Sequence, residues 1–516
     1  MKIDKSDRLV KLIKSLNPNE KRHFKLSVLK EKKGENAYFM KLYDLIDRAL
    51  AKRNSNEEFN IAEKDLRTIK NLSFNKRYLF ETILKNLRPF HWAPNPIMKI
   101  HLINLDVSLL KKKGFHKEAL VLIAKGKKLA YKYELHGLAL MFIKHEVETV
   151  AFSKKDFNYN FNLIEKRLEE AKKILASYDE SIALTGRRFQ SFLIESEAAL
   201  SMSPHLQKKL LSLVGEMKIK EETFSTMTKV NYNDTNAVFQ YYVKKDYSKS
   251  SDYSKNSIDL LSSHPDFIEN YSLGLYSWIY QYCSVCLKAG KYDEISKYLA
   301  VLKMEPFKFI SYAKRNENVD STILTFMHLI KLKLLLVKGD QQEVNEADAE
   351  TKKLIAKYGD SIPGESYFQM TYYMSINLFS IGENKRSTFY LKKILHSPET
   401  TFKREIHLFA LFLRALIHYE SSDFEKLDSS YSSILVRLNN FSNPLEDVYL
   451  RMALLICKEL ALINTRSEVT AKLIALKSEI TIAEKKKGVK FNEYLMAWVE
   501  SKIEKVPFAK KMLEVN

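Results

Sequence analysis

The chain has 516 residues, enough for several ordinary domains or for one long array of repeats. Glycine (13 residues) and proline (11 residues) are scarce, which disfavours sandwiches, barrels and Rossmann folds because these need glycine at turns and phosphate-binding loops. Hydrophobic residues make up 45% and charged residues 28%, which argues against a disordered or membrane-embedded chain and predicts an all-α protein.

The net charge of +21 is unevenly distributed. Residues 1–133 contain 31 Lys and Arg against 14 Asp and Glu, whereas residues 134–516 contain 53 against 49. A basic segment attached to a nearly neutral body indicates an anionic partner, such as nucleic acid, an acidic protein or a membrane face. A solubilising surface is the alternative interpretation.

The first 95 residues predict a basic helical module. Predicted helices cover 6–16, 18–29, 36–51 and a segment from Ser73 or Asn75 to Arg88. Asn17, Pro18 and Glu20 form a typical helix start, with a cap, a proline at the first position and an acid at the third. Pro89 and the prolines that follow it predict the module boundary at residues 95–96.

Basic side chains of this module are candidates for contacts to phosphate. The candidates lie on two predicted helices: Lys21, Arg22, Lys25, Lys76, Arg77, Lys85 and Arg88. The spacing of Arg77, Lys85 and Arg88 puts them on one helix face, which Glu81 interrupts. A solvated face or a ladder of i,i+4 charge pairs is the alternative interpretation.

A recurring turn divides residues 96–487 into units of 40–49 residues. The proposed turn residues are 114, 155, 201, 245, 290, 339, 382, 422 and 464. Each interval accommodates two helices of about 16–20 residues, which would have to stack on neighbouring pairs to bury both faces. The spacing therefore predicts an α-solenoid of about nine antiparallel helix pairs.

The first unit shows the helical period on two stripes. Met98, Leu102, Leu105 and Leu109 are predicted to form the apolar face of the first helix. On the second helix the corresponding stripe consists of small residues and one isoleucine: Ala119, Ile123, Gly126 and Ala130. Small residues allow close helix packing, so we expect Gly126 to serve packing.

The segment Gly114-Phe115-x-x-x-Ala119, preceded by an apolar helix, resembles the turn and second-helix start of a tetratricopeptide repeat. The resemblance extends over about residues 97–485 and implies a right-handed superhelix whose first helices line a concave groove for peptides or proteins. Two departures are the long period and the absence of the family's regular Trp and Pro positions. A HEAT-like array remains open. Leu9–Leu26 together with Tyr78–Leu87 resembles the opening of uncharacterised bacterial helical-repeat proteins, a resemblance that carries no function across.

Tyrosines on the predicted first helices are candidates for lining the groove, because tyrosine combines a large contact area with a polar group. These candidates are Tyr241, Tyr242, Tyr276, Tyr280, Tyr367, Tyr372 and Tyr373. Filling of the hydrophobic core is the alternative role.

Residues 488–516 are predicted to cap the array with a helix over 492–503. Its apolar side would contain Tyr494, Leu495 and Trp498. Four charged side chains would face water: Glu493, Glu500, Lys502 and Glu504.

No sequence motif for an enzyme, cofactor or metal site is found, and none of the three is expected. Cys283 and Cys286 form a CxxC pair, but the pair lies inside a predicted helix over 267–287, and Cys457 is the only other cysteine. We therefore expect core packing rather than zinc binding. The start of the chain has no apolar run like that of a signal peptide, which favours the cytoplasm.

The sequence thus favours a non-enzymatic scaffold that binds a protein or peptide in a groove. The alternative is a factor that contacts nucleic acid through residues 1–95, including a regulator with a repeat sensor. An enzyme whose active site assembles only in space is a third hypothesis.

Overall fold

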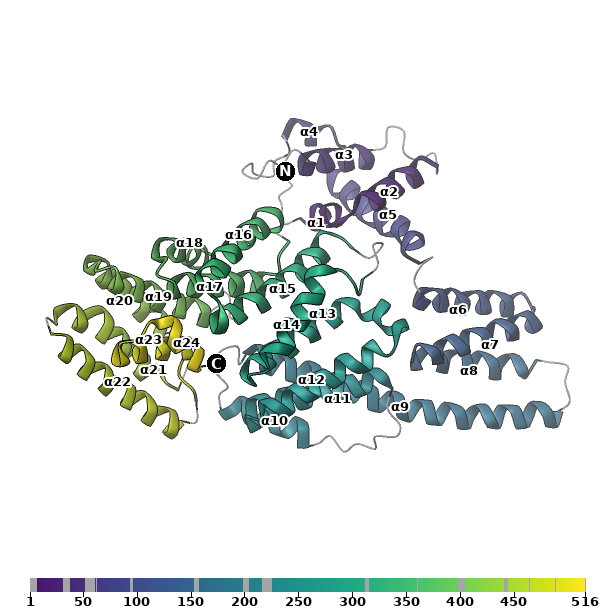
Figure 1. Ribbon diagram of the computed structural model, residues 1–516. Coiled ribbons are helices and arrows are strands. Elements are labelled where there is room, and N and C mark those ends of the chain that lie inside the picture. The colour runs from purple at the N-terminus through teal and green to yellow at the C-terminus, as the bar shows by residue number, and fades with distance from the viewer. Residues whose placement is uncertain are drawn as a thin grey trace. The chain divides into compact units, whose positions relative to one another are not determined.

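The computed structural model describes residues 7–30, 38–51, 61, 63–92, 96–152, 157–197, 204–215, 225–310, 315–359, 361–397, 404–439, 444–463, 465–487 and 489–515. Over these residues all regular secondary structure is helical, which confirms the all-α prediction (Figure 1). The predicted turns at 155, 201 and 464 lie outside the described residues, as does Asn95 at the predicted module boundary.

The chain divides into two compact units. Unit 1 comprises Met1–Glu180 and Tyr312–Val319, and unit 2 comprises Ser181–Ser311 and Asp320–Asn516. The first unit contains the helices α1 (Arg8–Ser15), α2 (Pro18–Lys30), α3 (Tyr38–Ala51), α4 (Glu63–Arg67), α5 (Leu72–Trp92), α6 (Pro96–Lys112), α7 (His116–Lys132), α8 (His136–Val150) and the first part of α9 (Phe157–Glu197).

Helices α1 to α5 share one hydrophobic core around Phe24, Tyr43 and Ile83. The predicted helix start is confirmed, because Asn17 Oδ1 accepts from Glu20 N–H at 2.9 Å and Glu20 Oε2 accepts from Asn17 N–H at 2.7 Å. The prediction that Pro89 ends the preceding helix is wrong, since α5 continues to Trp92. Pro89 has no N–H to donate to the carbonyl of Lys85, so the helix continues past it with one backbone hydrogen bond fewer.

Helices α6, α7 and α8 pack in sequence around a second core. The packing role of Gly126 is confirmed, because a Cβ atom there would lie 2.3 Å from the ring of Phe142. The predicted apolar face of α6 is wrong, because Leu105 and Leu109 are 54% and 60% exposed. Leu102 is also partly exposed. The neighbouring stripe of Ile100, Ile103 and Val107 is buried instead, since α6 is apolar on two sides and only one can face α7 and α8.

Helix α9 contradicts the predicted pattern of two helices per interval. Its 41 residues run without interruption where two helices and a turn were expected. Gly186 is the single glycine in α9, and the helix contains no proline, so nothing in this stretch enforces a break.

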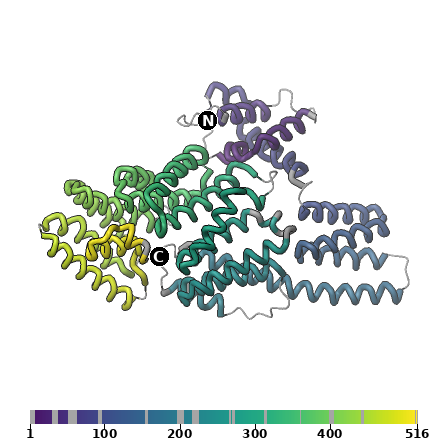
Figure 2. Tube along the Cα trace, in the orientation of Figure 1, coloured from purple at the N-terminus to yellow at the C-terminus, as the bar shows by residue number. Residues whose placement is uncertain are grey.

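Unit 2 is a succession of helices, most of which pack against the next helix along the chain (Figure 2). After the second part of α9 it contains α10 (Pro204–Gly215), α11 (Thr226–Phe239), the π-helical turn η2 (Gln240–Lys244), α12 (Tyr247–Ser262), α13 (Pro265–Lys288), α14 (Tyr292–Met304), α15 (Glu317–Lys338), α16 (Gln341–Tyr358), α17 (Gly364–Ser380), α18 (Asn384–Leu395), α19 (Arg404–Glu420), η5 (Phe424–Lys426), α20 (Leu427–Leu438), α21 (Glu446–Leu454), η6 (Leu455–Glu459), η7 (Leu460–Leu462), α22 (Arg466–Lys487), α23 (Glu493–Glu504) and α24 (Phe508–Val515).

Every predicted turn residue that the structure describes falls between two helices: 114, 245, 290, 339, 382 and 422. Gly290 and Gly382 have φ angles of +68° and +80°, a left-handed conformation that glycine adopts without steric cost. The backbone reverses at these positions, so that α14 packs on α13 and α18 packs on α17.

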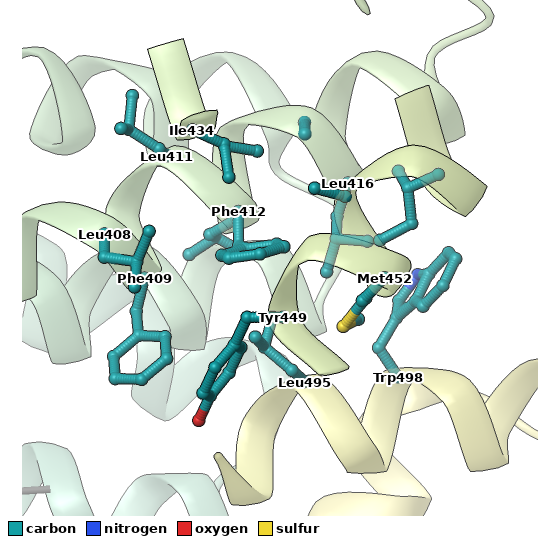
Figure 3. Packing of buried hydrophobic residues seen from close by; sticks show 14 of the residues in the cluster. Leu408, Phe409, Leu411, Phe412, Leu416, Ile434, Tyr449, Met452, Leu495 and Trp498 are labelled. Atoms are coloured by element: carbon teal, nitrogen blue, oxygen red, sulfur yellow. The ribbon is translucent and has the colours of Figure 1, made fainter. Parts of the chain in front are cut away.

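The largest described core in unit 2 centres on α19 and continues to the C-terminal helices (Figure 3). Tyr449 and Met452 of α21 lie there between α19 and α23. Trp498 of α23 is fully buried, and its Nε1 donates to Glu420 Oε1 at 2.7 Å. Helix α24, which was not predicted, adds Phe508 against Phe379 of α17 at a ring distance of 5.3 Å.

The expected polar face of α23 is only partly exposed. Glu504 is exposed, whereas the other three charged side chains are partly buried and make ion pairs. These pairs are Lys288–Glu493, Lys477–Glu500 and Lys502–Glu420, at 2.5, 2.7 and 2.5 Å. The reason is that helices α13, α22 and α19 each supply a partner to α23.

None of the described helices combines the length and apolar composition that crossing a membrane requires.

Candidate functional site

A cavity of about 1020 Å³ lies inside unit 2. Its wall draws on α9 to α13, α15, α17, α22 and α23, so it joins segments far apart in the sequence. Six of the lining side chains are tyrosines, namely Tyr241, Tyr242, Tyr247, Tyr280, Tyr373 and Tyr494. The cavity therefore combines aromatic surface with hydroxyl groups.

Tyr241 and Tyr242 enter the wall from the π-helical turn η2, which continues α11. Such turns insert an extra residue, widen the helix and are frequent at functional sites. The turn ends at Lys245 in a left-handed conformation (φ 56°), after which Asp246 caps α12. The two rings lie 4.7 Å apart, and neither hydroxyl hydrogen-bonds to another described residue. These hydroxyls are therefore available to a ligand.

The ammonium group of Lys333, on α15, lies near two tyrosine rings, Tyr280 of α13 and Tyr373 of α17. Its Nζ donates to Tyr280 Oη at 2.9 Å and to Ser284 Oγ at 3.2 Å. It also lies 4.7 Å from the ring centroid of Tyr280 and 5.5 Å from that of Tyr373. No carboxylate of a described residue comes within 4.0 Å of it. Hydroxyls and aromatic faces, rather than an acid, thus hold this cation.

Asp234 of α11 is a buried carboxylate at the cavity wall that accepts hydrogen bonds from three side chains. It is 4% exposed and accepts from Arg188 Nε at 2.9 Å and from Ser257 Oγ at 2.8 Å. The indole N–H of Trp278 donates to the same carboxylate. Asp234 and Arg188 therefore neutralise each other and fasten α9 to α11.

Glu195 of α9 lies near this pair but makes no ion pair with it among the described residues. Its Oε2 accepts from Gln281 Nε2 at 3.3 Å, and Gln281 Oε1 accepts from Arg188 Nη2 at 3.4 Å. A neutral amide therefore separates the carboxylate from the guanidinium. Burial raises the pKa of Glu195. The positive charges of Arg188 and Lys333 oppose this effect and the negative charges of Asp234 and Glu365 add to it, so burial decides the direction.

Glu365 of α17 is an exposed carboxylate in the cavity lining and also accepts a hydrogen bond from a glutamine amide. Its Oε1 accepts from Gln369 Nε2 at 3.3 Å, while Gln369 Oε1 accepts from Tyr280 Oη at 3.1 Å. A series of hydrogen bonds thus runs from Lys333 through Tyr280 and Gln369 to Glu365. Lys333 and Glu365 form no direct ion pair. Partial burial raises the pKa of Glu365.

Lysines dominate another part of the lining. Lys288 pairs with Glu493, and Lys490 pairs with Glu484 at 3.3 Å. Lys245 lies near Lys490, and its pKa is lowered by partial desolvation of the ammonium group and by the Lys490 charge. Lys245 and Lys490 are exposed, so this basic part of the lining faces solvent.

The structure brings together four of the seven predicted groove tyrosines: Tyr241, Tyr242, Tyr280 and Tyr373 line the cavity. It separates the other three from the cavity. Tyr276 and Tyr372 are 2% and 3% exposed and pack in the core, and Tyr367 packs against the core of α15 to α17.

Sequence reasoning missed the charged groups of the cavity. Glu195, Lys333 and Glu365 belong to three helices, and no local motif connects them. Tyr494 was assigned to the terminal helix rather than to a groove. Only the three-dimensional packing of α9, α15, α17 and α23 reveals their common site.

The basic candidates in unit 1 divide into paired and exposed side chains. Lys21 pairs with Asp47 at 2.8 Å, Lys25 pairs with Asp44 and Asp47 at 3.3 and 3.4 Å, and Lys76 pairs with Asp7. Arg22 of α2 is exposed, as are three side chains of α5, which are Arg77, Lys85 and Arg88. Internal ion pairs thus engage at least three of the seven candidates, Lys21, Lys25 and Lys76.

The CxxC cysteines lie within α13, as predicted, and Cys283, Cys286 and Cys457 are all buried free thiols. Burial raises the pKa of each thiol. Among the described residues, no cluster of three His, Cys, Asp or Glu side chains has the arrangement of a metal site.

No family model matches the chain, and neither a curated protein nor a solved structure is significantly similar to it.

Proposed function

We propose that this chain is a non-enzymatic binding protein whose unit 2 cavity holds a peptide or an extended segment of a partner protein. The observation that carries the proposal is the tyrosine-lined cavity with the unsatisfied hydroxyls of Tyr241 and Tyr242. Tyrosine provides contact area at a low cost in side-chain entropy, and its hydroxyl adapts to the N–H and C=O groups of a peptide backbone.

The cavity size supports a ligand larger than a metabolite. Its volume of about 1020 Å³ lies at the upper end of the range of roughly 300–1,000 Å³ for drug-sized ligands. A peptide of several residues fits that space and would contact several helices at once. We therefore favour a peptide segment over a single small metabolite.

The helix succession supports a repeat array as the scaffold of this site. Six predicted turn residues separate consecutive helices, and four groove tyrosines come from predicted first helices. A tetratricopeptide-like α-solenoid with a concave binding face is the arrangement that we propose for unit 2. The three cysteines are free thiols, which fits a reducing compartment such as the cytoplasm.

Binding of a degenerate hexapeptide library tests the proposal. Retention on the immobilised full chain, quantified by mass spectrometry, should select a subset of peptides, and Tyr241→Ala with Tyr242→Ala should abolish that selection. The matched control is Tyr159→Ala, which removes a tyrosine that is 51% exposed on α9. Equal retention by the wild type and the cavity variant would contradict the proposed function.

A second candidate function is nucleic-acid binding by unit 1. Arg77, Lys85 and Arg88 share an exposed face of α5 in the most basic part of the chain. Affinity from such contacts is weakly dependent on sequence and falls steeply with salt.

A salt titration of a fluorescent duplex and a single strand against the full chain tests this candidate. Replacing Arg77, Lys85 and Arg88 by Glu should weaken binding, whereas the same reversal of three exposed lysines in unit 2 should not. The control lysines are Lys353, Lys385 and Lys392. Absence of binding at about 50 mM salt would refute the candidate, because phosphate contacts are strongest at low salt.

A further inference from the structure

We propose that the cavity recognises a positively charged group on its ligand, an ammonium or guanidinium that pairs with Glu195 and Glu365. This inference rests on the proposed function and deepens it, because it names the chemistry that selects one peptide over another. Both carboxylates line the cavity, and neither has a cationic partner within 4.0 Å among the described residues.

The charge balance at this end of the cavity leaves one negative charge uncompensated when both glutamates are ionised. Asp234 and Arg188 form a closed ion pair and cancel. Lys333 contributes a single positive charge against the two carboxylates of Glu195 and Glu365. A ligand with one positive charge at this end makes the group neutral.

The hydrogen-bond pattern leaves the carboxylates with capacity for a ligand. Each accepts one hydrogen bond of 3.3 Å from a glutamine amide, Gln281 for Glu195 and Gln369 for Glu365. An ionised carboxylate has about four acceptor positions, so most of them remain open. Arg188 donates to the amide oxygen of Gln281, and Tyr280 donates to that of Gln369. These bonds orient the amide N–H groups that donate to the two glutamates.

The aromatic wall around the acids suits an organic cation. Lys333 already lies 4.7 Å from the Tyr280 ring centroid, which demonstrates that a tyrosine face here accommodates an ammonium group. The Glu195 carboxylate lies close enough to Tyr242 to raise the pKa of the Tyr242 phenol. Among the causes of that shift it is second only to burial. Carboxylates beside tyrosine faces provide both the charge and the cation–π contact that ammonium and guanidinium groups use.

Two sources on a peptide supply this chemistry: the free amino terminus and a Lys or Arg side chain. Three hexapeptide libraries distinguish them when each is passed over the immobilised full chain. The first has free amino termini and all side chains, the second is the same library acetylated, and the third has free termini but no Lys or Arg. A loss on acetylation identifies the terminus, and a loss in the third library identifies the side chain.

Two variants then test the role of the two glutamates. Fluorescence anisotropy measures their affinity for the single peptide that the wild type binds most tightly. Glu195→Gln and Glu365→Gln keep shape and hydrogen bonding but remove charge, and each should weaken binding by about tenfold or more. Glu346→Gln on the exposed face of α16 is the matched control and should leave the affinity unchanged. The circular dichroism of each variant checks that the helices remain folded.

The outcomes separate this inference from the proposed function. If a library that is both acetylated and free of Lys and Arg binds as tightly as the first, the inference is overturned while peptide binding stands. Unchanged affinity in the combined Glu195→Gln and Glu365→Gln variant overturns it equally. If none of the libraries binds the folded wild-type chain, the proposed function fails and the inference fails with it.

Discussion

Replacement of Trp498 by alanine should destabilise unit 2 more than any other single change in α23. The indole is fully buried between α23 and the core of α19 to α21, and it contacts Tyr419 edge-on at a ring distance of 5.8 Å. Loss of a buried Trp costs about 3–5 kcal/mol of unfolding free energy, because the site loses apolar burial and retains a cavity.

A conservative variant divides that cost into packing and hydrogen bonding. Trp498→Phe retains most of the ring but removes the N–H that donates to Glu420 Oε1. Glu420 keeps its ion pair with Lys502, so we expect this variant to lose about 1–2 kcal/mol. Leu462→Ala is the control, because Leu462 is 81% exposed and its removal should change stability by less than about 0.5 kcal/mol.

Urea denaturation of the full chain, followed by circular dichroism at 222 nm, measures these differences. The comparison uses the midpoint and slope of the same transition in each variant, because a chain with two units need not unfold in one step. A shift for Trp498→Ala no larger than that for Leu462→Ala would refute the burial of α23 against the core. Loss of peptide binding should accompany the large shift, since α23 also carries Glu493 and Tyr494 of the cavity.

Three further predictions concern a helix contact, the thiols and a cavity acid. Gly126→Ala should lower the free energy of unfolding by about 1–3 kcal/mol, because the new Cβ atom would overlap the facing aromatic ring. Gly186→Ala has open space around it and should raise the free energy of unfolding by up to about 1 kcal/mol. Thermal unfolding of the two variants measures both changes. Cys283 and Cys286 should react with a thiol reagent at pH 8 only after unfolding, because burial raises their pKa values, and elemental analysis should find no stoichiometric zinc. Burial raises the pKa of Glu195 above its usual 4.5, so ionisation penalises the folded state and stability falls as the pH rises from 4.5 through the raised pKa. The melting temperature of Glu195→Gln should therefore exceed that of the wild type by more at pH 8 than at pH 4, and an equal difference at both pH values would contradict the desolvation of this acid.

The helix-pair turns could be predicted because their signals are local. Gly290 and Gly382 each follow a long apolar helix and adopt the left-handed backbone that ends it. Helix α9 was predicted wrongly for the converse reason: the regular interval demanded a turn, but Phe157–Glu197 contains no proline and a single glycine. Spacing alone was a weaker guide than local turn chemistry.

Burial was harder to infer where a helix offers two apolar stripes. The periodicity of α6 was correct, but it did not reveal which stripe meets the small-residue face of α7. The same limit applies to the tyrosines: Tyr372 and Tyr373 are adjacent in sequence, yet the first is 3% exposed and packed in the core whereas the second lines the cavity. A rotation of 100° per residue separates the two environments.

The acids of the cavity lay beyond sequence reasoning altogether. Glu195 and Glu365 are separated by 170 residues, and each has the appearance of an ordinary helix carboxylate. Their common environment arises from long-range packing of α9, α13 and α17, with Gln281 and Gln369 as intermediaries.

The most direct test of the central claim is a crystal structure of the full chain bound to the hexapeptide that it retains most tightly. The account predicts that the peptide occupies the unit 2 cavity, that a hydroxyl of Tyr241 or Tyr242 hydrogen-bonds to it, and that its positive charge lies within 4 Å of Glu195 or Glu365. A peptide bound elsewhere on the chain, with the cavity holding only water, would contradict the claim.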